Sequence, residues 1–438
     1  MNLRDFFTKL DKEGRLVRVK KEVSHEFEIA NVLNTLGEQP TVFENVKGFN
    51  YPVFGGITAS RDTIAEALGT TKEKVLPKLV EALRNPKEPQ MVTNAPCQDV
   101  VIRGEDVDLN EIPLLMHLPD DGGRYASASI AIIKDPETGR NACYHRLMQV
   151  GKNRLTARLI PKRQTRTTYD KYPDQDIPMA VVLGNSVAVM LAASLGPPPG
   201  VDELAIANAL DETKLVKCVS CDLEVPADAE MVLEGRLVRS VDKEGPFVDL
   251  TETRDFVRQE PVFVVDAITH RKDAMYQVLL PGRMEHKTLM GMPKEPTIYD
   301  EVSKVADCKN VLVTLGGGSW LHSIVQIAKK TPEDGKKAIE AAFLGHKSMK
   351  SVTVVDADVD IYDPVAVEWA MATRFQANKD LVIRLDQPGS SLDPSGDHSG
   401  KKTKTDKTGY DATIPAHVDP KKYVRVKYGK VDLDAYLR

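Results

Sequence analysis

The chain has little of what marks secreted, membrane-spanning or nucleic-acid-binding proteins. Its 438 residues include 5 cysteines, too few for a disulfide framework, which indicates a reducing compartment. No stretch approaches the roughly 20 consecutive apolar residues of a membrane helix, and the first residues, MNLRDFFTKLDKEGRL, lack the apolar core of a secretory signal. The net charge of −5 disfavours general nucleic-acid binding. We therefore expect a cytoplasmic protein with no membrane span and no nucleic-acid partner.

The apolar residues that are present form short periodic stretches, and their rhythm changes twice along the chain. With 42% hydrophobic and 28% charged residues, the composition is globular, and the chain is too long for a single core. Helical and strand-like patterns mix over residues 1–97, which predicts an N-terminal α/β domain. Strands dominate residues 98–305 and predict a closed or split β-barrel. Strands alternate with helices over 306–438, which predicts a C-terminal α/β domain and a multi-domain α/β fold.

Local patterns within the last domain predict its elements. NVLVTL reads as a strand, GGGSW as a turn and LHSIVQIAKK as a helix. The GGGS turn could cradle a phosphate, but it has no Walker lysine, so an ordinary tight turn is favoured. Residues 387–409 are rich in Gly, Ser, Pro and Lys, and we expect them to form a mobile surface segment.

The stretch EGPFVD places two acids, Glu244 and Asp249, around a Gly-Pro pair and one phenylalanine. The two acids are either solvated turn residues or carboxylates that the turn directs into a site. The spacing alone favours the solvated turn.

A basic run lies in this acidic protein between residues 151 and 172. It contains Lys152, Arg154, Arg158, Lys162, Arg163 and Arg166. Such a run is either a solvated face or a site that captures an anion, for which a phosphate is the natural ligand. The lysines between 401 and 407 suggest the same function more weakly.

The cysteines include one C-x-x-C pair, Cys218 and Cys221. Because no second pair accompanies it, a four-cysteine zinc site is excluded. The default interpretation is two ordinary cysteines on a strand.

Several longer segments resemble one protein family, and they occur in the family's order. They are RNACYHRLMQVGKNRLTARLIP, LDETKLVKCVSCDLEVPADAEMVLEG, EGPFVD and VDADVDIYDPVAVEWAMATR. They are similar to segments of the UbiD family of decarboxylases, which use prenylated FMN. The resemblance covers most of the chain from about 95 to 415. It implies an N-terminal α/β domain, a central split β-barrel that holds the flavin, and a C-terminal α/β domain used in oligomerisation.

The resemblance also implies a catalytic set of Glu244, Arg146 and Asp249. Arg146 would orient the substrate carboxylate and keep Glu244 ionised, because a nearby opposite charge favours the charged form. Asp249 would deliver the proton that replaces CO2. Val248 stands where the family has a glycine, which could alter the turn slightly. On this reading the two acids of EGPFVD point into a site.

A flavin site and a metal site follow from the same resemblance. The metal would be manganese or magnesium, with potassium as a further candidate ion, held by Asn141, Glu203 and Gln164. Gln164 replaces a histidine of one family member, so its ligation is an open question. The residues that match the flavin site are Asn141, Tyr144, His145, Arg146, Arg158, Leu159, Arg163, Gln164, Ser194 and Lys407.

The implied activity is a reversible, non-oxidative decarboxylation of an α,β-unsaturated or aromatic carboxylate. The chain looks most similar to archaeal members that act on trans-anhydromevalonate 5-phosphate in isoprenoid synthesis. A hydroxybenzoate-type acid is the alternative substrate, and a non-catalytic flavin-binding subunit is a third possibility that the retained catalytic set opposes. A flavin prenyltransferase would supply the cofactor, and we expect a homodimer or a larger homo-oligomer.

Overall fold

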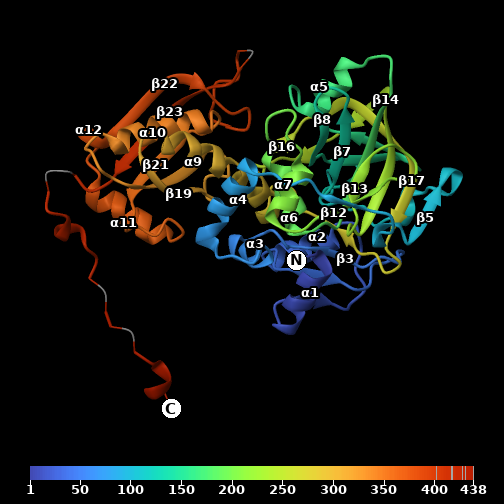
Figure 1. The fold of residues 1–438 in the computed structure, drawn as a ribbon, viewed down its shortest axis with the longest axis horizontal. Helices are drawn as coiled ribbons and strands as arrows, with labels where there is room; N and C mark the ends of the chain where they lie inside the picture. The colour runs from blue at the N-terminus through green and yellow to red at the C-terminus, as the bar shows by residue number, and fades with distance from the viewer. Residues whose placement is uncertain (401, 416–417, 427, 430, 438) are drawn as a thin grey trace. The chain divides into compact units, whose positions relative to one another are not determined.

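The computed structural model describes residues 1–400, 402–415, 418–426, 428–429 and 431–437 (Figure 1). The chain forms two compact units, the first from Met1–Pro296 and Val313–Trp320, the second from Thr297–Leu312 and Leu321–Arg438. The domain boundaries expected at 97/98 and 305/306 stay a prediction. None of the helices in the described residues is long and apolar enough to cross a membrane.

The first unit begins with helices packed around a small sheet. The helix α1 (Leu3–Lys12) starts at Asn2, whose side chain accepts a hydrogen bond from the Asp5 amide, and it buries its apolar face. The sheet has the strand order β1 (Val17–Val19), β2 (Thr41–Phe43), β3 (Val53–Gly55) and β18 (Tyr276–Gln277). The neighbouring helices are α2 (Glu28–Thr35), α3 (Arg61–Ala67) and α4 (Val75–Arg84).

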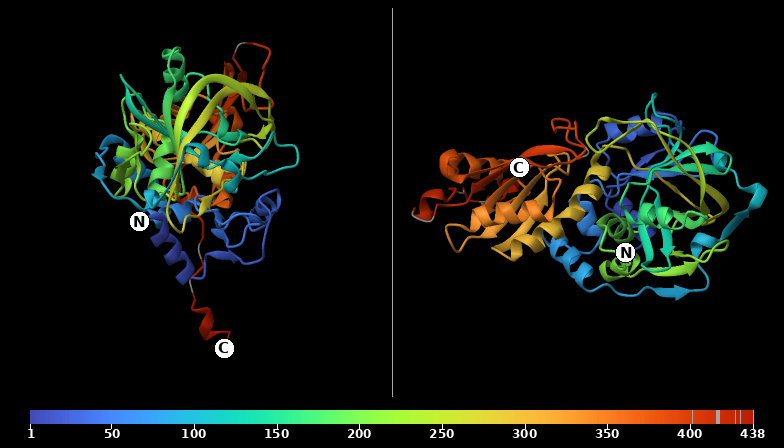
Figure 2. Two further views of the ribbon diagram at one scale, coloured as in Figure 1. Left: turned by 90° about the vertical axis from the view of Figure 1, so that its right-hand side faces the viewer. Right: turned by 90° about the horizontal axis from the view of Figure 1, so that it is seen from above.

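A large sheet forms the centre of the first unit. Its strand order is β6 (Tyr125–Ala126), β9 (Leu147–Gly151), β10 (Arg154–Ala157), β17 (Arg258–His270), β14 (Met231–Glu244), β11 (Ile177–Leu183), β7 (Ile130–Asp135) and β8 (Gly139–Tyr144), and β5 (Val100–Arg103) also pairs with β17. The strands β14 and β17 are long and curved (Figure 2). The multi-domain α/β class is confirmed, but the sheet is open: β6 and β8 are its ends, and no strand pairing in the described residues joins them.

Further elements of the first unit lie along this sheet. A smaller sheet has the order β13 (Glu224–Pro226), β12 (Lys214–Lys217) and β4 (Gln90–Val92), and a hairpin joins β15 (Phe247–Val248) to β16 (Arg254–Asp255). The remaining helices are α5 (Gln164–Lys171), α6 (Val187–Leu195), α7 (Glu203–Leu210) and α8 (Met284–Gly291).

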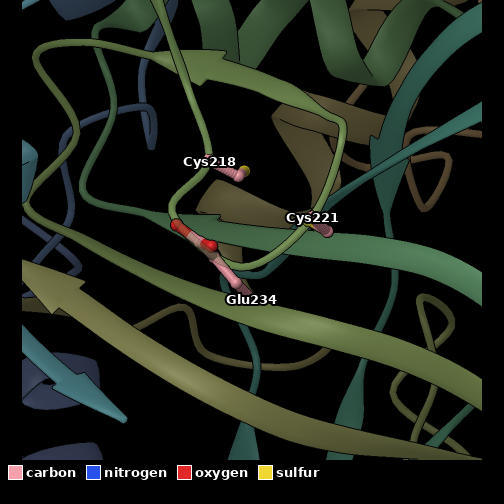
Figure 3. A group of neighbouring side chains, drawn as sticks. All are labelled: Cys218, Cys221 and Glu234. Atoms are coloured by element: carbon pink, nitrogen blue, oxygen red, sulfur yellow. The ribbon is translucent and has the colours of Figure 1, made fainter.

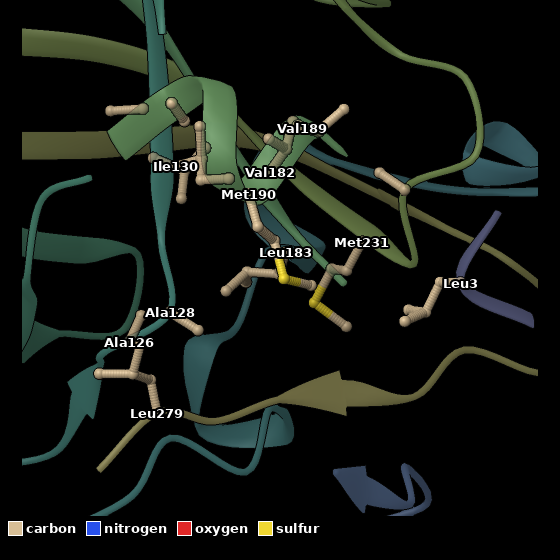
Figure 4. Close-up of a cluster of buried hydrophobic side chains, with 14 of the residues drawn as sticks. Leu3, Ala126, Ala128, Ile130, Val182, Leu183, Val189, Met190, Met231 and Leu279 are labelled. Carbon is tan, nitrogen blue, oxygen red and sulfur yellow. The ribbon is translucent and has the colours of Figure 1, made fainter. Parts of the chain in front are cut away.

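The helix α6 lies in the main apolar core. It is apolar on nearly all sides, as a helix surrounded by other elements must be. Its Val189 and Met190 belong to one buried cluster with Leu183 of β11 and Met231 of β14 (Figure 4). The core therefore holds the ends of β11 and β14 in place.

The second unit is a helix-covered sheet. Its strand order is β19 (Asp307–Val313), β20 (His322–Ala328), β21 (Ser351–Asp356), β23 (Lys404–Ala412) and β22 (Leu381–Pro388), with β20, β21 and β23 parallel. Its helices are α9 (Glu295–Ser303), which begins in the first unit, α10 (Asp334–Gly345), α11 (Pro364–Arg374) and α12 (Ala377–Asp380). As the Asp-Pro pair predicts, the Asp363 side chain caps α11 by accepting from the Val365 amide.

Two sequence-based expectations in the second unit are wrong. The stretch expected as a helix after GGGSW is the strand β20, because it lies between β19 and β21 and its apolar residues are buried. The segment 387–409, expected to be mobile, ends in β23, which pairs with both β21 and β22. A few of its polar residues are buried with partners: the Thr405 hydroxyl donates to Asp393, so low apolar content did not prevent a strand.

The close approach of β14 and β17 at Gly235 generates a testable prediction. The ladder shifts register between Glu234 and Gly235, and a β-carbon at Gly235 would lie 1.9 Å from the Val264 carbonyl oxygen. Gly235→Ala should therefore cost about 1–3 kcal/mol and lower the Tm in thermal unfolding. In the control Gly316→Ala the new methyl meets nothing within 4 Å. Equal Tm values for the two variants would contradict this packing.

Candidate active site

A buried ion pair joins two distant parts of the central sheet. Arg146 lies between β8 and β9, and Glu244 is the last residue of β14. Arg146 Nε and Nη2 donate to Glu244 Oε1 and Oε2, both at 2.9 Å. The Glu244 side chain is fully buried, and a carboxylate in such a place requires a partner of opposite charge. Glu244 is therefore not a solvated turn residue.

The turn after Glu244 is packed beneath this ion pair. The Tyr125 hydroxyl donates to Glu244 Oε1 at 3.1 Å and accepts from the Gly245 amide at 3.1 Å. Burial raises the pKa of Tyr125 well above its usual value, so it stays a donor. The Phe247 ring lies 4.0 Å from the Tyr125 ring and 5.3 Å from the Arg146 guanidinium carbon. Gly245 has φ +92°, a conformation that favours glycine.

The second acid on Arg146 is Asp255, a residue that the sequence did not suggest. Arg146 Nη2 donates to Asp255 Oδ2 at 2.8 Å, and Arg258 Nη2 lies 2.6 Å from Asp255 Oδ1. Burial would raise the pKa of Asp255, but the hydrogen bond from Arg258 and the charge of Arg146 outweigh it and lower the pKa. The β15–β16 hairpin pairs Phe247 with Asp255 and brings this acid to Arg146. The FVDLTETRDF stretch, read as a hairpin, could have revealed it.

Asp249 directly follows β15, and His286 on α8 shares its surroundings. The Leu250 amide donates to Asp249 Oδ1 at 2.6 Å. Burial lowers the pKa of His286 to about 4; the charge of Asp249 opposes this shift and that of Arg146 adds to it. The Gly282 amide donates to His286 Nδ1 at 2.9 Å. His286 is therefore neutral near pH 7, with its proton on Nε2. Sequence reasoning missed it, although it is a lone histidine among apolar residues in MEHKTLMGM.

Two of the three expected metal ligands lie next to each other. Asn141 is on β8 and Glu203 starts α7, and Glu203 Oε2 accepts from the Ala142 amide at 2.9 Å. Burial raises the pKa of Glu203 to about 8, against the effect of that amide. The Asn141 amide nitrogen donates to Cys143 Sγ at 3.2 Å, so the ligand atom it can offer is its carbonyl oxygen. A buried carboxylate beside an amide oxygen suits a hard divalent cation.

The third expected ligand, Gln164, makes a hydrogen bond to a different residue, Thr138. It begins α5, and its Nε2 donates to the Thr138 hydroxyl at 3.0 Å. The preceding residue, Arg163, is exposed. Lys294, which sequence reasoning missed, lies near it: burial lowers the pKa of Lys294 to about 8, and the positive charge of Arg163 adds to the shift. Two cations in such proximity favour binding of an anion.

A cysteine and a histidine lie beside the expected metal ligands. The Sγ of Cys143 is 3.3 Å from His145 Nε2, and His145 Nε2 is 3.0 Å from the Thr165 hydroxyl. His145 Nδ1 lies 2.9 Å from the Arg158 carbonyl oxygen, to which it can only donate. Burial would raise the pKa of Cys143, but the charge of His145 and hydrogen bonds lower it to about 7.

The remaining residues of the expected flavin site have different surroundings. Arg158 donates to Glu260 Oε1 at 2.6 Å, and the Leu159 amide donates to Glu260 Oε2 at 3.4 Å. Ser194 on α6 donates to the Leu191 carbonyl at 2.6 Å. The basic run is therefore not a uniform solvated face, since Arg158 is committed to a buried acid.

Lys407 belongs to the second unit. It lies on β23, and its Nζ donates to the Lys347 carbonyl at 2.5 Å and stands 5.3 Å from the Phe343 ring. Burial lowers the pKa of Lys407 to about 8. Lys401, in the same lysine run, lies outside the described residues.

Tyr144 and Asn185 have buried polar groups that a polar ligand such as a flavin would satisfy. The Tyr144 hydroxyl and both amide atoms of Asn185 are buried without a hydrogen-bond partner in the part of the chain that the structure describes. Such groups are rare in native proteins and call for a ligand or ordered water. Tyr144 is on β8, as is Asn141, so its hydroxyl and the Asn141–Glu203 oxygens are groups of the kind that a flavin and a divalent metal require.

Comparisons with known proteins agree along most of the chain. Three family models match in sequence order. They are described as the N-terminal, Rift-related and C-terminal domains of 3-octaprenyl-4-hydroxybenzoate carboxy-lyase, and they match residues 7–83, 90–284 and 287–412.

Similar proteins and structures cover nearly the full length. The chain is 40% identical to the anhydromevalonate phosphate decarboxylase of Methanothermobacter thermautotrophicus, covering 94% of this chain and 97% of that protein. It is also 40% identical to the enzyme of the same name from Methanosarcina mazei, with 94% and 96% covered. The UbiD-class enzyme HmfF from Pelotomaculum thermopropionicum, solved with FMN, superposes with a TM-score of 0.94 at 36% identity and full coverage of both chains. Klebsiella pneumoniae 3,4-dihydroxybenzoic acid decarboxylase (AroY) gives 0.92 at 26% identity, covering 100% of this chain and 99% of that one.

The ion pair yields a prediction about stability. Arg146→Ala leaves the Glu244 and Asp255 carboxylates without this guanidinium and should cost about 3–5 kcal/mol in the free energy of unfolding. Adding Glu244→Gln should recover part of that loss, as a double-mutant cycle would measure. The exposed Arg154 on β10 provides the control, and Arg154→Ala should change stability by less than about 0.5 kcal/mol. Additive effects of the Arg146 and Glu244 changes would contradict the pairing.

Proposed function

The chain belongs to the UbiD family of carboxy-lyases, and from this premise we propose that it decarboxylates an anhydromevalonate phosphate. The substrate would be trans-anhydromevalonate 5-phosphate, an α,β-unsaturated carboxylate of isoprenoid synthesis. The observation that carries the proposal is the buried Arg146–Glu244 pair, with Asp249 and His286 close enough to interact with each other. Similarity at 40% identity to two archaeal enzymes of that name supports the choice of substrate.

The cofactor in this proposal is prenylated FMN, made by a flavin prenyltransferase. When bound, the modified flavin supplies the electron sink that loss of CO2 requires. Asn141 and Glu203 would hold a manganese or magnesium ion at its phosphate, with potassium as a further candidate. Tyr144 and Asn185 would satisfy their buried polar groups on the flavin. The solved UbiD-class relatives that contain FMN or prenylated FMN support the choice of flavin.

The chain's own residues would orient the substrate and move one proton. Arg146 would align the substrate carboxylate while it holds Glu244 ionised. Asp249 would deliver the proton that replaces CO2. His286, neutral near pH 7, can donate from Nε2 and so position either the substrate or Asp249 without adding charge.

A phosphorylated substrate needs a cation besides those that hold the flavin phosphate. Arg163 was assigned to the flavin by resemblance, and Lys294 is the cation that the structure adds beside it. We assign Lys294 to the substrate phosphate. The double negative charge of the phosphate would raise the pKa of the Lys294 ammonium toward its usual value. The rival substrate is an aromatic acid, supported by the structural similarity to AroY.

Assembly and location complete the proposal. We expect a homodimer or a larger homo-oligomer in the cytoplasm; the relative HmfF has been solved in an evolved dimeric form.

The proton-donor role of Asp249 is testable by substitution. Asp249→Asn preserves the shape of the side chain but cannot donate a carboxylic proton, so decarboxylation should fall by roughly 10²–10⁴-fold. Flavin content, measured by absorbance, should stay near normal. Asp242→Asn, a matched change on β14, should retain activity. If Asp249→Asn keeps most of the activity, the donor is another residue, and Glu244 is the next to test.

The substrate is tested by direct assay. The flavin-loaded enzyme should convert trans-anhydromevalonate 5-phosphate and not 4-hydroxybenzoate. Lys294→Met should raise KM about tenfold or more, because a charge-assisted contact contributes about 1.5–3 kcal/mol, and added salt should weaken binding by screening. Lys272→Met, which changes an exposed lysine, should leave KM unchanged. Conversion of the aromatic acid alone would overturn the substrate and leave the decarboxylase assignment intact.

A further inference from the structure

A second cluster of metal-ligating side chains lies away from the residues assigned to decarboxylation. Cys218 and Cys221 do not lie on a strand, as the sequence suggested, but in the turn between β12 and β13. Their Sγ atoms and a carboxylate oxygen of Glu234 on β14 all lie within 4.8 Å of one another (Figure 3). We propose that these three side chains form a binding site for a thiophilic divalent metal ion of the zinc type.

The turn has the form of a cysteine knuckle. The Cys218 amide donates to the Leu223 carbonyl at 2.8 Å and closes the turn, so both cysteines are presented by a short rigid loop. Two cysteines separated by two residues in a β-hairpin turn are a frequent half of structural zinc sites. The missing second pair, which excludes a four-cysteine site, is replaced here by a side chain from a distant strand.

Glu234 is held in position to act as a ligand. It is fully buried. Its Oε1 accepts from the Val219 amide at 3.1 Å, and its Oε2 accepts from the amide and the hydroxyl of Ser220 at 2.7 and 2.8 Å. A carboxylate has about four acceptor positions, so one remains, on Oε1. The loop thus orients the carboxylate as outer hydrogen bonds orient metal ligands.

The three ligand atoms would fit the tetrahedral coordination of a metal ion if they moved slightly closer together. With metal–sulfur and metal–oxygen distances of about 2.3 and 2.1 Å, ligand atoms around zinc lie about 3.5 Å apart. The fourth position is left for water.

Charge provides a reason for a cation at this place. Both Sγ atoms lie within 4.8 Å of an oxygen of the buried Glu234 carboxylate, so further negative charge is unfavourable there unless a cation accompanies it. A divalent cation reverses this effect: it binds two thiolates and the carboxylate, and the two thiols release their protons to solvent.

The metal ion would link the smaller sheet to the central sheet. The knuckle joins β12 to β13 in the smaller sheet, whereas Glu234 belongs to β14 of the central sheet. The same strand ends at Glu244, the partner of Arg146. Metal binding would therefore stabilise the strand that presents the buried acid, without a part in the chemistry.

Metal analysis of the purified full-length protein tests this site. Protein produced with added zinc should retain about one zinc per chain after gel filtration. When cobalt replaces the zinc, the protein should show the charge-transfer absorbance that is specific to thiolate ligands. Cys218→Ser, Cys221→Ser and Glu234→Gln should weaken zinc binding roughly a hundredfold or more. Cys308→Ser, at a buried cysteine of the second unit, should leave it unchanged.

Two further measurements distinguish this site from the flavin metal site and from a disulfide. Glu203→Ala, which removes the oxygen ligand assigned to the flavin metal, should keep the thiolate–cobalt absorbance, so either site can fail without the other. A chelator should lower the Tm of the unmodified protein, a result that does not depend on variants that fold. The proposal would be overturned if zinc-loaded and chelator-treated protein had the same Tm and the cobalt-loaded protein showed no thiolate absorbance. An intact mass lower by two hydrogens and no bound metal would show a Cys218–Cys221 disulfide instead, and would also overturn it.

Discussion

The burial of the Glu244 carboxylate is the constraint on which the rest of the first unit depends. A fully buried carboxylate costs several kcal/mol unless a cation and hydrogen-bond donors surround it. Arg146 provides the cation, with two parallel hydrogen bonds, and Tyr125 provides a third. These groups come from different strands, so the ion pair forms only when β6, the β8–β9 connection and β14 are all in register. Asp255 then accepts a further hydrogen bond from the guanidinium of Arg146.

The strand β14 connects the features that matter for function. It carries Glu244 at its end, Gly235 where β17 comes closest, and Glu234 beside the cysteine turn. It pairs with both β11 and β17, so two neighbouring strands fix its position. The cysteine turn and the Arg146–Glu244 pair are thus both attached to this one strand.

Sequence reasoning singled out Arg146 and Glu244, which the structure pairs, but missed residues that other elements bring beside them. Arg146 and Glu244 meet as the family pattern implies, whereas the roles of Asp249 and of the metal ligands stay predictions. Asp255, His286 and Lys294 were missed because each is an ordinary residue in its own segment and gains importance only from its neighbours. Two structural expectations failed for a related reason. The sequence of β20 predicts a helix, and the first residues of β23 were expected to be mobile. Both segments are strands because they pair with neighbouring strands of the sheet.

The sequence by itself determined the family, through segments that resemble it. It also determined the α/β class and the local turns and caps, because these depend on periodicity and on contacts a few residues apart. Only the tertiary structure decided which groups meet across the sheets. The pairing of β15 with β16 selected Asp255 as the second acid on Arg146, and the position of β14 brought Glu234 to Cys218 and Cys221. The physical reason is that strand register between distant segments follows from the packing of the whole core, which no short stretch of residues contains.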